Sequence, residues 1–397
     1  MKISTSNVLN FILCLLSKEN LKKHTQNILI EIWVSLTAWL INNYKHNQLL
    51  EAKSSVISQY HKLKKHVHVQ KKLVEFNNIK KKQNFKQKSD EWLRMRQNYL
   101  TASSIATVLG FSGKGAKQSL LYEKSARKSS KFTGSFATGW GEKYEPVARD
   151  LFSFKNQIQV DEYDLLPSTK YPFLAVSPDG ITEKGDLLEI KCPYSRVIDG
   201  KIKTDYYHQM QEQMVVCELD KAIFLECKFE EMTDHDFLLE HKHYKGIVIS
   251  YLKKVPDDDD VDDDTTNNDP KCYKYEDPVF NIEYAFSPIV NSIDDLSNVE
   301  NLKKINDQLI TWFDQTVESL NQNPDTFYLS RYNWKNTVYR QQDVPLDKEW
   351  IKTYIPRLTE FWNKICYYRK NGCHELEQLM EGRKQQKRGK VASECIL

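Results

Sequence analysis

Two short segments decide the fold: Ser-Pro-Asp-Gly at residues 177–180 and Leu-Leu-Glu-Ile-Lys at residues 187–191. The intervening Thr-Glu-Lys-Gly-Asp has the composition of a turn, so we expect the apolar runs on either side of it to pair as a hairpin. Side chains alternate along a strand, which places Glu189 and Lys191 on one face. The sequence therefore predicts a sheet edge where Asp179, Glu189 and Lys191 lie close together.

Two carboxylates and a lysine at a buried sheet edge need a partner for their charge. Two carboxylates about 4 Å apart repel by roughly 4 kcal/mol at an effective dielectric constant of about 20. A hard divalent cation such as Mg²⁺ removes that cost, and it binds through one or two carboxylates, waters and substrate phosphates. A neighbouring lysine can orient or deprotonate a water, or offset charge in the transition state. A surface hairpin whose Glu and Lys pair across strands is the alternative, and these residues alone favour it.

The surrounding pattern predicts an α/β fold. Strand-like runs occur at Phe173–Val176, Leu187–Lys191 and Ala222–Phe229, and a helix is expected from Tyr206 to Cys217. The first two runs are the expected arms of the hairpin. This β–β–α–β order implies a central mixed β-sheet flanked by helices. Further helices are expected over residues 101–109, 139–154, 298–321 and 347–368.

Charge is segregated along a chain whose net charge is only +3. Residues 51–90 contain eleven lysines against three acids, whereas residues 257–264 contain seven aspartates and no basic residue. Lysine neutralises DNA phosphates without reading sequence, so the basic segment is interpreted as a DNA-backbone contact. A solvated helix face is the equally weighted alternative.

The cysteines and the apolar stretches indicate a soluble, intracellular protein. The eight cysteines form no Cys-x-x-Cys pair, which favours free thiols in a reducing compartment. The apolar stretches at residues 8–17 and 28–41 are shorter than the about 20 residues that a membrane-spanning helix needs. No membrane partner is therefore expected.

Four blocks surround the hairpin in one order along the chain. They are Trp92-x3-Arg96 with Thr101-Ala102-Ser103, Trp140-Gly141-x3-Glu145-x2-Ala148-Arg149, Asp179-x9-Glu189-x-Lys191, and Tyr206-x2-Gln209-x-Gln211-x2-Met214. Together they resemble the PD-(D/E)XK nuclease signature and, more narrowly, the phage lambda exonuclease/YqaJ viral recombinase family, over about residues 92–229. The composition, rich in lysine, asparagine and isoleucine, is similar to that of AT-rich giant DNA viruses, so we expect a giant-virus member.

The resemblance implies a role for each matching residue. Asp179 and Glu189 are the expected main metal ligands, and Glu145 and the backbone carbonyl of Ile190 complete the set. Lys191 is expected to position or activate the attacking water. The cofactor is expected to be Mg²⁺, or else Mn²⁺, with two ions per site. The expected phosphate- and DNA-binding residues are Arg96, Ser103, Ser104, Tyr206 and Gln209.

Other readings stay open at the binding positions. Arginine suits bidentate capture of a phosphate, and a hydroxyl at a helix start adds a donor; for Arg96 a surface ion pair is the less favoured alternative. Ser103 could be a plain helix cap, and Ser104 is nearly as good a candidate for the phosphate contact. Tyr206 and Gln209 could be packing residues instead.

The resemblance implies a metal-dependent deoxyribonuclease, a 5′→3′ exonuclease on linear double-stranded DNA that uses a two-metal mechanism. One alternative is a structure- or sequence-selective endonuclease on the same fold. Another is a non-catalytic DNA-end-binding scaffold for recombination.

The expected organisation has four parts. They are a basic helical extension at residues 1–88, a lambda-exonuclease-like core at 89–256, an acidic low-complexity loop at 257–270, and a helical region with a disordered basic tail at 271–397. The substrate is expected to be double-stranded DNA ends. A homo-oligomer, either a ring trimer or a dimer, is expected, with an annealing protein or a helicase as a further partner. The expected location is the host cytoplasm, a viral factory or the virion.

Overall fold

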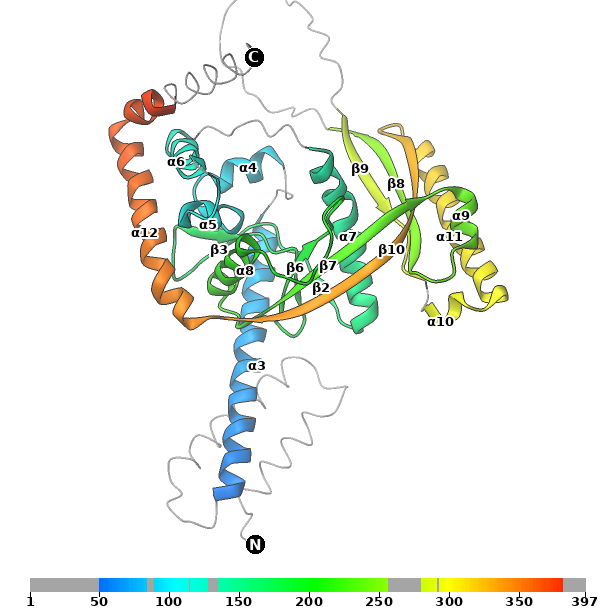
Figure 1. Cartoon of the computed structure of the whole chain (residues 1–397), viewed down its shortest axis with the longest axis horizontal. Coiled ribbons are helices and arrows are strands. Elements are labelled where there is room, and N and C mark those ends of the chain that lie inside the picture. Colours follow the sequence, from blue (N-terminus) through cyan, green and yellow to red (C-terminus); the bar gives the residue numbers. More distant parts are fainter. Residues whose placement is uncertain are drawn as a thin grey trace, which may run out of the picture.

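The computed structural model describes residues 50–83, 89–113, 115–127, 135–255, 280–290 and 293–380. Its helices are α3 (Leu50–Lys82), α4 (Asp90–Arg96), α5 (Ala102–Leu109), α6 (Ala116–Ala126), α7 (Phe136–Asn156), α8 (Thr204–Cys217), α9 (Asp234–Leu239), α10 (Ile293–Leu296), α11 (Val299–Gln322) and α12 (Lys348–Asn371). Its strands are β1 (Leu100–Thr101), β2 (Val160–Asp161), β3 (Leu166–Pro167), β4 (Leu174–Val176), β5 (Gly180–Thr182), β6 (Leu187–Lys191), β7 (Lys221–Met232), β8 (Lys245–Lys254), β9 (Phe280–Phe286) and β10 (Thr326–Pro345). Figure 1 shows their arrangement.

A seven-stranded mixed sheet forms the centre of the molecule, in the order β2-β5-β6-β7-β10-β8-β9. Strands β6 and β7 are parallel, and the chain crosses between them through α8, whereas the other neighbours are antiparallel. A smaller sheet has the order β1-β4-β3. The predicted α/β fold, with a central mixed sheet flanked by helices, is confirmed.

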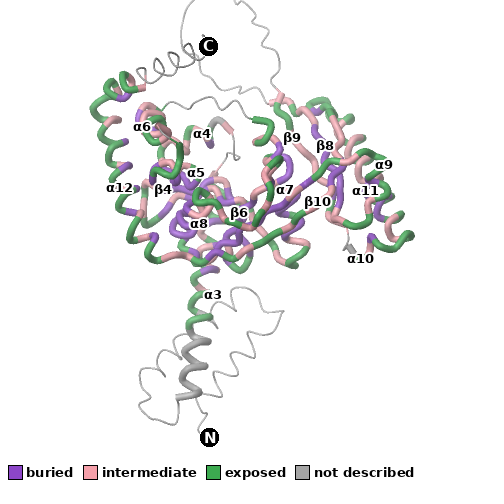
Figure 2. The backbone as a smooth tube through the Cα atoms, in the orientation of Figure 1, coloured by how far each residue is buried: buried purple, intermediate pink, exposed green. Residues whose placement is uncertain are grey.

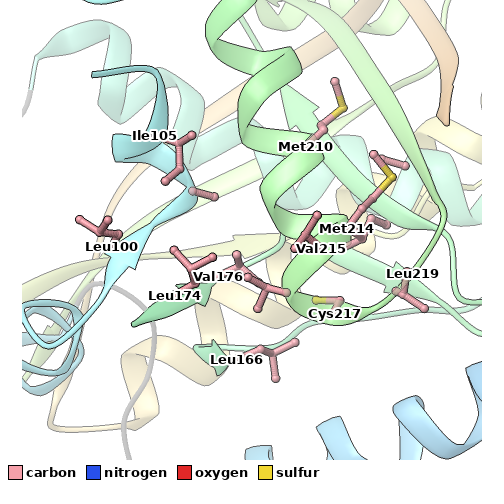
Figure 3. Close-up of a cluster of buried hydrophobic side chains, with 14 of the residues drawn as sticks. Leu100, Ile105, Leu166, Leu174, Val176, Met210, Met214, Val215, Cys217 and Leu219 are labelled. Carbon is pink, nitrogen blue, oxygen red and sulfur yellow. The ribbon is translucent and has the colours of Figure 1, made fainter. Parts of the chain in front are cut away.

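The two faces of β6 are covered by different helices. Leu187 belongs to a buried cluster with Met210 and Met214 of α8, and Figure 3 shows part of this cluster between α5, α8 and the short strands β3 and β4. Leu188 and Ile190 belong to a second cluster, which includes aromatic side chains of α7. A parallel strand covered on both faces reads as a nearly continuous apolar run, so the charged residues within β6 stand out.

The hairpin forms, but with a different first arm from the one predicted. β6 pairs with β5, which follows Asp179, through the registers Gly180↔Leu188 and Ile181↔Leu187. The apolar run expected as the first arm is β4, which lies in the smaller sheet. A side chain at Gly180 would collide with Val160 of β2, so this short, close-packed arm requires glycine. Its three residues are too few for the period-2 pattern to reveal.

The C-terminal region contains the two expected helices, α11 and α12, together with two strands that the sequence reading missed. Strand β10 lies between β8 and β7 in the sheet. Its first half pairs with β8, and its second half pairs with β7. Helix α11 packs on β8 and β10 of this sheet, whereas α12 packs on α5 and α6, and the two helices lie at opposite ends of the molecule (Figure 1). The described part of residues 271–397 is thus helical and stranded, rather than helical alone.

The lysine-rich helix α3 packs onto the core by its C-terminal half. Val69, Leu73 and Phe76 are buried in the same cluster as the α8 methionines, and Val69 contacts the turn at Gly185. Figure 2 shows the buried part of α3 at the body of the molecule and exposed residues beyond it. The expected division into four parts stays a prediction, and the acidic segment at 257–270, the tail from 381 and the two apolar stretches lie outside the described residues.

Within the described ranges, no helix combines the length and the apolar character that crossing a membrane requires.

Candidate active site

Strand β6 brings together Glu189 and Lys191, two of the predicted catalytic residues. The Glu189 side chain is fully buried and forms a salt bridge with the ammonium of Lys191, whose side chain is 23% exposed. The amide of Gln213 on α8 also donates to Glu189, with an Nε2–Oε2 distance of 2.8 Å. The shared face predicted for Glu189 and Lys191 is therefore confirmed, and that face is the one that α8 covers.

Asp179 is tied to the same point from the start of β5. Its Oδ2 accepts a hydrogen bond from the backbone amide of Ile190, at 2.7 Å, and its carbonyl accepts one from Arg149 Nη1 of α7, at 3.0 Å. The bond to Ile190 crosses the hairpin and fixes the Asp179 carboxylate beside β6. The role of the Ile190 carbonyl as a ligand stays a prediction.

The charges at β6 shift one another's pKa values. Burial raises the pKa of the Glu189 carboxyl above its ordinary value, as does Asp179, whereas Lys191 and Gln213 act in the opposite direction. Burial alone would lower the pKa of Lys191, but Glu189, Asp179 and Glu145 outweigh it and raise that pKa. Lys191 is therefore a firmly charged ammonium surrounded by acids.

Glu145 approaches the site from α7. Ser135 caps this helix, and the buried face of α7 packs on β6. The negative charge of the half-buried Glu145 contributes to raising the pKa values of Lys191 and Cys192. Among the described residues, however, no three acidic, histidine or cysteine side chains converge in a geometry ready to hold a metal ion. The pair Asp179 and Glu189 still fits a hard cation, because Mg²⁺ usually binds through one or two carboxylates. Glu145 as a third ligand stays a prediction.

Arg96 and Ser103 are in contact, as a shared phosphate site requires. Arg96 Nη2 donates to Ser103 Oγ at 2.9 Å and to Thr101 Oγ1 at 3.1 Å. The guanidinium stacks on the Trp92 ring, 4.1 Å from its centroid, which orients the plane of the fork. Ser104, the other candidate, uses its hydroxyl at the start of α5, where it donates to the Thr101 carbonyl at 2.7 Å.

Tyr206 and Gln209 lie on α8, on the side of the helix nearest β6. The Tyr206 ring stands 5.1 Å from Lys191 Nζ and 5.7 Å from the Phe224 ring, so it both packs and contacts the site. Gln209 is half-buried, and its side chain makes no hydrogen bond within the described ranges. Gln211, by contrast, is structural: it donates to the Pro345 carbonyl and accepts from the Asp347 amide.

The sequence reading missed Gln213 and Glu212. Gln213 follows Gln209 by four residues and Glu212 follows it by three, so both lie on its side of α8, and helical spacing was the signal that could have found them. Gln213 contacts Glu189, whereas Glu212 is fully buried and neither carboxylate oxygen has a hydrogen-bond partner in the described part of the chain.

Comparisons with known proteins agree with the motif resemblance. Residues 91–220 match the YqaJ-like viral recombinase domain. Uncharacterized protein R354 of Acanthamoeba polyphaga mimivirus is 28% identical over an alignment of 326 residues that covers 76% of this chain and 56% of that protein. The chain thus spans only about half the length of this relative.

Two solved structures are also similar. The alkaline exonuclease LHK-Exo from Laribacter hongkongensis is 17% identical, with a TM-score of 0.40 over 75% of this chain and 100% of that chain. A phage-related exonuclease from Haemophilus somnus is 16% identical, with a TM-score of 0.29 over 54% of this chain and 96% of that chain. By its motifs and by this domain match, residues 91–220 of the chain are similar to the YqaJ-like viral recombinase domain, and the mimivirus relative is a giant-virus protein.

Proposed function

We propose that the protein is a metal-dependent deoxyribonuclease that degrades linear double-stranded DNA from its 5′ ends. The observation that carries this proposal is the convergence of Asp179, Glu189 and Lys191 at one end of a buried hairpin. A fully buried carboxylate beside a second carboxylate is costly unless a cation or a reacting group uses it. The family of the matching domain agrees with this chemistry.

Asp179 and Glu189 would hold Mg²⁺ or Mn²⁺. A bound divalent cation of this kind supplies Lewis acidity and a water of lowered pKa, and two ions can clamp both oxygens of an in-line displacement. Ligand carboxylates must be ionised, so the raised pKa of Glu189 makes cation affinity increase with pH. Glu145 and the Ile190 carbonyl are the further ligands in this proposal.

Lys191 would act through its charge. Its raised pKa keeps the amine protonated at neutral pH, so it fits a group that offsets negative charge on the reacting phosphate and orients the water. Its partial exposure lets the ammonium face a substrate, whereas its salt bridge to Glu189 fixes its position. The Tyr206 ring lies beside the lysine on the α8 side, and the Gln209 amide, which makes no hydrogen bond among the described residues, would contact the substrate.

In this proposal, Arg96 makes degradation start at the 5′ end of the DNA. Its Nη2 holds Thr101 and Ser103, and within the described residues its other nitrogens form no hydrogen bond, so they remain for a terminal 5′-phosphate. Ser103 would add a hydroxyl to the same phosphate. The family resemblance further supports DNA ends as the substrate, a ring trimer or dimer as the assembly, and an annealing protein or helicase as partner.

A cleavage assay with matched variants tests the proposal. We expect Glu189→Gln and Asp179→Asn to reduce Mg²⁺-dependent degradation of a linear duplex by at least about 1,000-fold, because each removes a ligand charge. Glu183→Gln is the control, since Glu183 is an exposed acid in the turn of the same hairpin. Normal cleavage by Glu189→Gln, or equal loss in the control, would contradict the assignment.

A further inference from the structure

The second half of β10 borders a cavity that the reaction scheme above does not use. Strand β8 pairs with β10 as far as Lys335, and from Val338 to Pro345 β10 pairs with β7 alone. No strand of the described ranges covers the opposite edge of this second half. The cavity at this edge has a volume of about 550 Å³, within the range of about 300–1,000 Å³ that is typical of ligand sites. Its walls come from the end of α7 and from β10, and they are Lys155, Asn156, Tyr339, Arg340, Gln341 and Gln342.

The alternation of side chains in β10 fixes where the cavity lies. Neighbouring residues of a strand point to opposite faces of the sheet, so walls formed by four consecutive residues of β10 place the cavity along the edge of this strand. Arg340 pairs with Glu226 of β7, which pairs in turn with Lys191 of β6. Adjacent strands are about 4.8 Å apart, so the backbones at Arg340 and Lys191 lie about 10 Å apart. The cavity is therefore a close neighbour of the candidate active site and shares no residue with it.

Two cations border the cavity, and the protein neutralises neither of them. Among the described residues Lys155 forms no ion pair, and its ammonium lies 4.6 Å from the centroid of the Tyr244 ring and 4.9 Å from that of Tyr339. Arg340 is exposed and, in the same described ranges, forms neither an ion pair nor a side-chain hydrogen bond. Its guanidinium packs against Gly200, where a side chain would collide with it. The N–H donors of this guanidinium are therefore available to a ligand.

The nearest acids of β7 and β10 are already paired, so the cavity keeps its positive charge. Glu226 Oε1 accepts from Arg196 Nη2 at 2.6 Å, and Asp343 Oδ2 lies 3.7 Å from Lys221 Nζ. None of the six wall residues is an acid. Such a cavity attracts an anion, because an anion offsets two cations at a place where the protein supplies no carboxylate.

Amide and hydroxyl groups fix the walls of the cavity. Asn156 Nδ2 donates to the Tyr339 hydroxyl and to Gln341 Oε1, each at 3.2 Å, and the Tyr339 hydroxyl donates to Gln341 Oε1 at 2.8 Å. These bonds tie the end of α7 to β10 (Figure 1). The amide nitrogen of Gln342 is buried and has no hydrogen-bond partner in the described part of the chain. Cations together with amide groups suit a ligand that carries both phosphates and bases.

We propose that this cavity binds single-stranded DNA, with Lys155 and Arg340 on the phosphates and the amides on the bases. The cations gain charge-assisted contacts with phosphates, and the bases of an unpaired strand can enter a cavity that a stacked duplex cannot. The inference rests on the proposed function, because removal of one strand from a duplex leaves the other strand unpaired near β6. A protein strand could add to the same open edge, but its main-chain pairing would not use the two cations.

The test measures how the full-length protein binds an oligothymidylate at several salt concentrations, in a chelating buffer that prevents cleavage. In Lys155→Gln/Arg340→Gln we expect the slope of log affinity against log salt to flatten by about 1.4, because each phosphate contact to a single strand accounts for about 0.7. If the affinities converge at about 1 M salt, binding at about 0.1 M is about 25-fold weaker. A hairpin duplex without a single-stranded tail should bind the variant and the parent equally.

Two matched variants separate the cavity from total charge and from folding. Lys303→Gln/Lys304→Gln removes two exposed charges from α11 and should keep the slope of the parent. Lys155→Arg/Arg340→Lys retains both charges at the cavity and should also keep it. An unchanged slope in Lys155→Gln/Arg340→Gln would overturn the proposal and leave the open edge of β10 to a protein strand. The same flattening in the α11 variant would also overturn it, since the effect would then reflect total charge.

Other outcomes are equally decisive. Displacement of the oligonucleotide by thymidine monophosphate at matched phosphate concentration would identify a site for free nucleotides. Equal weakening of duplex binding would identify a duplex contact, and either result would contradict single-strand binding. Cleavage of a linear duplex by the parent with Mg²⁺ tests the proposed function separately. A parent that binds the oligonucleotide through the cavity but cleaves no duplex would refute the nuclease and leave the cavity assigned.

Discussion

Lysines in two regions of the molecule have pKa values that are shifted in opposite directions. At β6, Lys191 is paired with the carboxylate of Glu189, and neighbouring acids raise its pKa. In the cluster formed by α9, α11 and β8, Lys245 donates to two neutral acceptors, the Phe237 carbonyl at 2.6 Å and Asn306 Oδ1 at 2.8 Å. Burial there lowers the pKa of Lys245 to about 8.

The difference shows what marks a functional site in this fold. Neutral acceptors satisfy the hydrogen bonds of Lys245 without compensating its charge, and the opposing charge of Glu240 does not cancel the effect of burial. This lysine therefore anchors α11 to the sheet. At β6, several acids gather around one ammonium, an arrangement that packing does not require. A shifted pKa alone therefore does not identify the site, whereas the sign of the surrounding charge does.

The largest expected effect separates the two lysines by activity. Lys191→Met should reduce cleavage of linear DNA by at least about 1,000-fold, because it removes the charge at the reacting phosphate. Lys245→Met should leave the rate per folded molecule near that of the parent. The measurement is single-turnover cleavage after both variants have been matched for folded fraction by circular dichroism. Equal losses in the two variants would mean that the comparison reflects folding only.

The next effect distinguishes the two regions by how the free energy of unfolding depends on pH. Lys245 has a lowered pKa when folded, so the parent loses stability as pH falls from about 10 toward about 8, by about 2–3 kcal/mol. Lys245→Met should remove this slope. Glu189 has a raised pKa when folded, so the parent also loses stability as pH rises above the ordinary Glu value, and Glu189→Gln should remove that second slope.

Urea denaturation from about pH 4 to about pH 10 measures how the free energy of unfolding changes with pH in the Glu189 window and in the Lys245 window. The expected pattern is one slope lost in each variant while the other is retained. A variant that loses both slopes, or neither, would contradict the assignment of separate charge environments to the two regions.

The smallest effect concerns the lysines of α3, where pairing again divides residues of one type. Lys72 is held by Glu75 and Glu218, whereas Lys62, Lys64, Lys81 and Lys82 are exposed. If the exposed lysines contact DNA, each one changed to Gln should flatten the slope of log affinity against log salt by about 0.9. Lys72→Gln should not change the slope. Equal slopes in all variants would assign the exposed lysines to solvent.

Local patterns predicted most of the fold around the site. The strand Leu187–Lys191 and the helix ending at Cys217 appear as expected, because each has a clear period and clear end signals. The prediction of the first arm of the hairpin was wrong, because the true arm, β5, has only three residues and its apolar run is too short to show a period. β10 was missed, because its pairing with both β7 and β8 depends on contacts far apart in the sequence.

The site divides in the same way. The motifs predicted that Arg96 lies near Ser103 and that Glu189 lies near Lys191, and the structure shows both contacts. Gln213 and Glu212 have the helical spacing from Gln209 that could have found them, but the sequence alone does not say which of the three contacts the residues of β6. The hydrogen bond from Arg369 to the Gln97 carbonyl is harder still to predict, because it depends on how α12, which lies beyond the matched residues 91–220, packs on the core.

The most direct test is a time course with Mg²⁺ on two DNA substrates, a linear duplex with a 5′-phosphate end and a covalently closed circle. We expect the linear duplex to be degraded and the circle to survive, and we expect Glu189→Gln to erase the degradation. Loss of the circle at a similar rate would identify an endonuclease. Survival of both substrates, with tight binding to ends, would contradict the central claim and identify a non-catalytic end-binding protein.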